Sequence, residues 1–120
     1  MLTLSQFYEQ TGGNAYDTIN RLGLSEEMLI TFLKKFLNDE SFTNLEISLN
    51  AKDNETAFRM AHTLKGITAN LGLQNLFEKS SVITEFLRGN AENKLCEVKK
   101  IMPALKQEYT KTVNLINKLG

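Results

Sequence analysis

The chain has few of the residues that build metal centres and disulfides. It holds one cysteine, Cys96, one histidine, His62, one proline, Pro103, and no tryptophan. A lone cysteine forms no disulfide within the chain, which suits a reducing compartment, so we expect a cytoplasmic protein. One cysteine and one histidine also argue against a zinc site built by side chains alone, and we expect no bound metal or cofactor.

Long apolar runs and a net charge are missing as well. No uninterrupted apolar stretch is long enough to span a bilayer, and the N-terminus lacks the basic flank and apolar core of a secretion signal. The 14 basic residues balance the 14 acidic residues, so no overall field attracts nucleic acid or an anionic membrane. We therefore expect neither nucleic acid nor a membrane as a partner.

The sequence does have helical periodicity throughout. Its 120 residues, 42% of them hydrophobic, suit a single globular domain. Apolar residues recur three and four positions apart, and no stretch alternates as a strand would. We predict an all-α fold, an antiparallel four-helix bundle over residues 25–119 with a short N-terminal helical cap over residues 1–24. The predicted bundle helices are 26–51, 54–71, 74–88 and 91–118.

Two places leave the course of these helices open. Near Asn38–Ser41 the apolar stripe drifts, which agrees with one long, slightly bent helix or with a break. Pro103 lies inside the last helix, where its missing backbone N–H should kink or interrupt the helix. By contrast, Gly72 and Gly89 follow the second and third helices as glycines at helix C-termini do.

The predicted helix 54–71 carries the only histidine. Its apolar positions gather on one side of the helical wheel: Ala57, Met60, Ala61, Leu64, Ile67 and Leu71. His62 and Gly66 fall on the opposite side, so the imidazole should face water one turn before a residue without a side chain. A glycine inside a helix costs about 1 kcal/mol relative to alanine. We interpret Gly66 as a gap through which another molecule approaches His62, with Lys65 within reach of the imidazole.

The residues around His62 resemble the signature of a known family. The string AHTLKG at 61–66, followed by Leu71-Gly72-Leu73 and Leu76, is similar to that of histidine-containing phosphotransfer (HPt) domains. These domains carry phosphoryl groups between receiver domains in multistep two-component signalling. The resemblance is sharp over residues 57–76 and elsewhere rests on helix lengths and periodicity. It implies that His62 accepts a phosphoryl group, on Nε2, from a receiver-domain aspartate or a hybrid sensor kinase and passes it to another receiver.

The resemblance also implies a division of labour between this chain and its partner. The chain has no nucleotide motif and no carboxylate cluster near His62, so we expect a phosphocarrier and not an enzyme. The receiver domain of a response regulator would supply the Mg²⁺ and the acidic pocket, while Lys65 screens the phosphoryl group on His62. The expected docking surface for the receiver surrounds the histidine and comprises Gly66, Phe58, Arg59, Ala69 and Glu55. Phe58 is lateral on the wheel and could instead be buried.

This sequence departs from the family pattern at one position. In several such domains a Gln or Glu on the next helix orients the imidazole, but the corresponding position here falls on Thr84, a shorter side chain. Either water bridges the two groups, or another residue orients His62, or the register differs. Arg88, one turn further on, is a candidate phosphoryl or partner contact, or simply a cation that complements the helix C-terminus.

An alternative function stays open at this point. A non-catalytic helical adaptor could bind a signalling partner through the same face, with His62 incidental. The joint pattern of His62, Lys65, Gly66 and the Leu-Gly helix end favours the phosphorelay intermediate. We expect a monomer, and the well-formed helices near both ends favour a free-standing protein over a fragment of a larger kinase.

Overall fold

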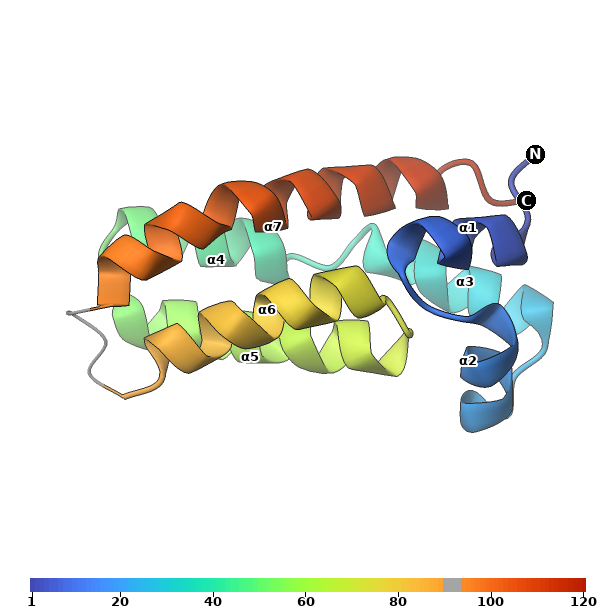
Figure 1. Cartoon of the computed structure of the whole chain (residues 1–120), viewed down its shortest axis with the longest axis horizontal. Helices are drawn as coiled ribbons and strands as arrows, with labels where there is room; N and C mark the ends of the chain where they lie inside the picture. The colour runs from blue at the N-terminus through green and yellow to red at the C-terminus, as the bar shows by residue number, and fades with distance from the viewer. Residues whose placement is uncertain (90–93) are drawn as a thin grey trace.

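The computed structural model describes residues 1–89 and 94–120. Its helices are α1 (Leu4–Thr11), α2 (Ala15–Leu22), α3 (Glu26–Phe36), α4 (Ser41–Asn50), α5 (Asn54–Asn70), α6 (Gln74–Leu87) and α7 (Leu95–Ile116). Figure 1 shows α4, α5, α6 and α7 along the long axis, each running opposite to the one before, with α1, α2 and α3 at one end. Apart from one isolated bridge between Leu2 and Leu119, the described residues form no β-structure. The predicted all-α helical bundle is confirmed.

The first predicted bundle helix is divided into α3 and α4, so the prediction of one helix over 26–51 was wrong and the break at Asn38–Ser41 is real. The backbone N–H groups of Leu37 and Asn38 bond to carbonyls three residues back, which tightens the last turn of α3. The Asp39 carboxylate then accepts the backbone N–H of Ser41 at 2.9 Å. Short polar side chains of this kind compete with the helix for backbone hydrogen bonds.

The last helix, α7, continues through Pro103 without a break, so of the two predicted alternatives, a kink or an interruption, the interruption is wrong. The proline side chain is exposed, and so is Lys99, the residue four positions back whose carbonyl loses its helical partner. Water can satisfy that carbonyl, which limits the penalty of the missing N–H. The predicted start of this helix at residue 91 lies outside the described residues.

The inner face of α5 consists of small and apolar residues. Ala57, Ala61, Leu64 and Thr68 are all buried, and α4 and α6 pack along the two sides of this face. Alanine side chains let neighbouring helices approach α5 closely, so the helix is held in one rotation about its axis. That rotation turns the opposite face, with His62 and Gly66, to solvent.

The N-terminal cap, with α1 and α2, forms hydrogen bonds to the C-terminal end of α5. The Tyr8 side chain from α1 is fully buried, and its hydroxyl donates to the Leu71 carbonyl at 2.6 Å. From α2, the Arg21 guanidinium donates to the carbonyls of Ala69 and Asn70 at 3.2 and 2.8 Å. These carbonyls belong to the last two residues of α5 and to Leu71, its C-cap, where a helix lacks its own donors and a cation is favourable.

We expect Tyr8→Phe to lower the free energy of unfolding by about 1–2 kcal/mol, because the buried Leu71 carbonyl loses its donor. Urea denaturation of both proteins measures the difference. Tyr16→Phe is the matched control, since Tyr16 is 72% exposed and should change stability little. Equal effects of the two substitutions would contradict the role of the Tyr8 hydroxyl.

The same pair of variants has a defined pH dependence. Burial raises the pKa of Tyr8 well above its usual range, which outweighs the opposing hydrogen bond with Thr18. The stability that the protonated phenol provides is complete below about pH 10, the unfolded pKa, and is lost as the pH rises toward the folded pKa. The stability advantage of the wild type over Tyr8→Phe should therefore shrink above about pH 10.

Candidate functional site

His62 lies on the exposed face of α5, near the middle of the helix. The helix begins cleanly because the Asp53 side chain accepts the backbone N–H of Thr56 at 3.2 Å. A hydrogen bond with the Thr56 side chain, followed by this backbone bond, lowers the pKa of the Asp53 carboxyl and so favours the ionised cap. The imidazole is thus held out in water by a rigid, well-capped element.

Phe58 lies one turn before His62 and links it to α6. The two ring centroids are 5.9 Å apart with planes tilted by 49°. The Arg88 guanidinium, from the C-terminus of α6, lies 5.3 Å from the centre of the Phe58 ring. Phe58 is half-buried, so it lies at the junction of α5 and α6, as the lateral wheel position indicated.

Glu85, also on α6, binds the Arg88 guanidinium. Its two carboxylate oxygens accept hydrogen bonds from Nε and Nη2 of Arg88, both at 3.1 Å. The Arg88 hydrogen bond, followed by the charges of Arg88, Lys65 and His62, lowers the pKa of Glu85. The carboxylate therefore lies within electrostatic reach of His62. Sequence reasoning missed Glu85, although an acid three residues before Arg88 on a helix predicts an ion pair.

Thr84 lies in the core and not beside the imidazole as the sequence suggested. Its side chain is fully buried, and the hydroxyl donates to the Ser80 carbonyl at 2.7 Å within α6. The proton that could have bonded His62 is therefore committed to a backbone carbonyl. One residue further on, 100° around the helix, Glu85 is exposed on the surface that α6 shares with His62.

The remaining predicted site residues surround His62 on α5. Lys65 is half-buried on the same side as Phe58, while Glu55, Arg59 and Ala69 are exposed. The Arg59 guanidinium donates to the Thr56 hydroxyl at 3.2 Å. A Cβ built on Gly66 would meet no atom within 4 Å, so the backbone beside His62 is open. The structure thus gathers the predicted residues of α5 around one exposed imidazole.

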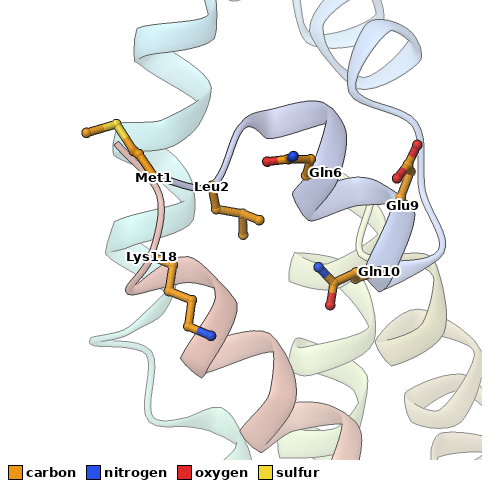
Figure 2. A pocket seen from close by; sticks show the side chains of 6 residues that line it. All are labelled: Met1, Leu2, Gln6, Glu9, Gln10 and Lys118. Atoms are coloured by element: carbon orange, nitrogen blue, oxygen red, sulfur yellow. The ribbon is translucent and has the colours of Figure 1, made fainter.

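One hollow of the surface lies away from the predicted site residues. Figure 2 shows this hollow, formed by α1 and the two ends of the chain and lined by Met1, Leu2, Gln6, Glu9, Gln10 and Lys118. None of the predicted site residues lines it. In the part of the chain that the structure describes, no three His, Cys, Asp or Glu side chains come together to hold a metal ion, and no helix could span a membrane.

Comparison with known proteins gives one match. A family model described as Hpt domain matches residues 27–114, from α3 to α7, which is most of the chain and includes His62. No curated protein and no solved structure gives a significant match.

We expect Gly66→Ala to raise the free energy of unfolding by about 0.5–1 kcal/mol, because alanine favours the helix and its methyl group meets open space. Gly23→Ala is a matched control, since its Cβ would also meet no neighbour but its φ of 66° lies in the left-handed region. That substitution should be destabilising. Chemical denaturation of both variants tests the pair, and a destabilised Gly66→Ala would contradict the open geometry.

Proposed function

The chain belongs to the Hpt domain family, whose members transfer phosphoryl groups through histidine in phosphorelays, and we propose that it accepts the group on His62 and passes it on. The observation that carries this assignment is that the chain has one histidine. That histidine lies exposed on α5, inside the segment that matches the family. The donor is a receiver-domain aspartate or a hybrid sensor kinase, and the acceptor is a second receiver domain.

The proposed reaction is the in-line transfer of a phosphoryl group between an aspartate oxygen of the partner and a nitrogen of His62. The lone pair of a neutral imidazole nitrogen, Nε2 by family resemblance, attacks the phosphorus of the partner's aspartyl phosphate. The P–N bond forms as the P–O bond breaks, and the aspartate leaves as a carboxylate with the bonding electron pair. The proton on the other ring nitrogen stays on the ring or passes to solvent, and the return transfer reverses each step.

Charges on this chain support the phosphoryl group in transit. Phosphoryl transfer depends mainly on positioning and on neutralising charge on the phosphoryl oxygens. Lys65 lies one turn after His62 on α5 and Arg59 lies one turn before it, on opposite sides of the imidazole. Arg88 lies one aromatic ring away, over Phe58. These cations also complement an acidic receiver pocket and would help the partner to dock.

We assign the metal-dependent part of the reaction to the partner. The described residues around His62 offer one carboxylate on α6, Glu85, and it is bound to Arg88. Mg²⁺ bound in the receiver would neutralise the phosphoryl oxygens there, while this chain presents the nucleophile. Gly66 lets the rim of that pocket reach His62, with Phe58, Arg59, Ala69 and Glu55 as surrounding contacts. In this arrangement a single copy of the chain suffices, so the proposed carrier is a monomer.

The direct test incubates the protein with radiolabelled, phosphorylated receiver domains and compares the wild type with His62→Gln. We expect label on the wild type alone, labile to acid and stable to base, because phosphohistidine has this stability. The amide keeps a polar side chain of similar length at an exposed position, so folding should be unaffected. If no receiver transferred label but the wild type and His62→Gln bound receivers equally, the non-catalytic adaptor would be the better description.

Bulk at Gly66 should slow transfer without unfolding the protein. We expect Gly66→Leu to reduce the rate of phosphoryl transfer by about tenfold or more, and Gly66→Ala less, because close approach of reacting groups governs such reactions. Rapid-quench kinetics at limiting receiver measures the rates. Ala104→Leu places the same side chain at an exposed position of α7 and should transfer normally. An unaffected rate in Gly66→Leu would exclude close docking at this point.

A further inference from the structure

The ion pair between Glu85 and Arg88 has a geometry that goes beyond an ordinary surface contact. The planar guanidinium makes two parallel hydrogen bonds to one carboxylate, both at 3.1 Å, while it also lies over the Phe58 ring. A bidentate bond combined with stacking fixes both the position and the orientation of the cation. Arg88 is therefore held in place one ring away from the imidazole.

Capping of α6 does not account for this arrangement. A cation at a helix C-terminus stabilises it by bonding or facing the last carbonyls. Among the described residues, both hydrogen bonds of the Arg88 guanidinium go to Glu85, and the backbone N–H of Arg88 bonds the Glu85 carbonyl separately at 3.3 Å. Both side chains are about half exposed, and exposed ion pairs contribute little to stability.

The pair has a consequence for a phosphoryl group on His62. The phosphorylated imidazole carries negative charge, which nearby cations stabilise and nearby carboxylates oppose. In the resting protein Glu85 occupies two of the five N–H donors of Arg88, one on Nε and one on Nη2, and so fixes where the guanidinium lies. The pKa of Glu85 is lowered chiefly by its bond to Arg88 and further by the charges of Lys65 and His62, which places the carboxylate in the field of the site.

We propose that Glu85 is a positioning residue that restrains Arg88 and thereby keeps the phosphoryl group on His62 easy to transfer. When the P–N bond breaks, the electron pair returns to the imidazole nitrogen and the phosphoryl group bonds an aspartate oxygen of the receiver. A freed Arg88 would bind the phosphoryl oxygens on His62 and hold the group back. Glu85 thus shifts the phosphoryl equilibrium from the histidine toward the receiver. This inference rests on the proposed function of His62.

The experiment uses a receiver domain that exchanges label with the wild-type protein and measures the ratio of phosphohistidine to phosphoaspartate at equilibrium. We expect Glu85→Gln to raise this ratio by about two- to fivefold, because the interaction energy of an exposed ion pair corresponds to a change of about that factor in an equilibrium. Arg88→Gln should not raise the ratio, and the double variant Glu85→Gln/Arg88→Gln should lose the increase. The increase should also diminish at high salt, because exposed charges are then screened.

Glu78→Gln is the matched control, because it also removes an exposed carboxylate from α6. The Glu78 carboxylate accepts a hydrogen bond from the side chain of Gln74 and none from Arg88. This control should leave the ratio unchanged. An unchanged ratio in Glu85→Gln, an equal increase in Glu78→Gln, or an increase that persists in the double variant would overturn the proposal. A wild type that takes no label from any receiver would instead refute the proposed function itself, so the two failures are distinguishable.

Discussion

The rotation of α5 about its own axis is the constraint on which the rest of the site depends. Ala57, Ala61 and Leu64 are fully buried, so the helix settles only with this face inward. At 100° per residue, a shift of one position would turn His62 toward a neighbouring helix. Burial of the inner face and exposure of the imidazole are therefore one event. The direction in which His62 points therefore follows from core packing and requires no polar contact.

The parts of the structure that repeat regularly were predictable from the sequence. The helices of the bundle, their boundaries at Gly72 and Gly89 and the exposed face of α5 all follow from apolar spacing and helix-end residues. The break between α3 and α4 was left open, because the drifting apolar stripe fits a bent helix as well as a break. The structure shows that local hydrogen bonds, among them the one that the Ser41 backbone N–H donates to the Asp39 carboxylate, end α3 there. Tolerance of Pro103 likewise depends on which side of α7 faces water.

The part of the site on α6 required the structure. Which residue of α6 shares a surface with His62 depends on how α6 is rotated about its axis relative to α5. An error of one position in that rotation exchanges the buried Thr84 for the exposed Glu85. Neither spacing nor composition determines that rotation. The contact between Arg88 and Phe58 joins residues from different helices, so no periodicity within one helix could reveal it. The predicted α5 residues could be placed on one exposed face from the sequence because they share one helix.

The N-terminal cap resolves a conflict between docking and helix stability. Gly66 leaves the backbone open beside the histidine but weakens α5, whose last turn would then fray most easily. Tyr8 and Arg21 donate hydrogen bonds to carbonyls of that turn. Both residues lie before residue 27, outside the segment that matches the family. Structure outside the shared bundle therefore supports the helix on which the proposed chemistry takes place.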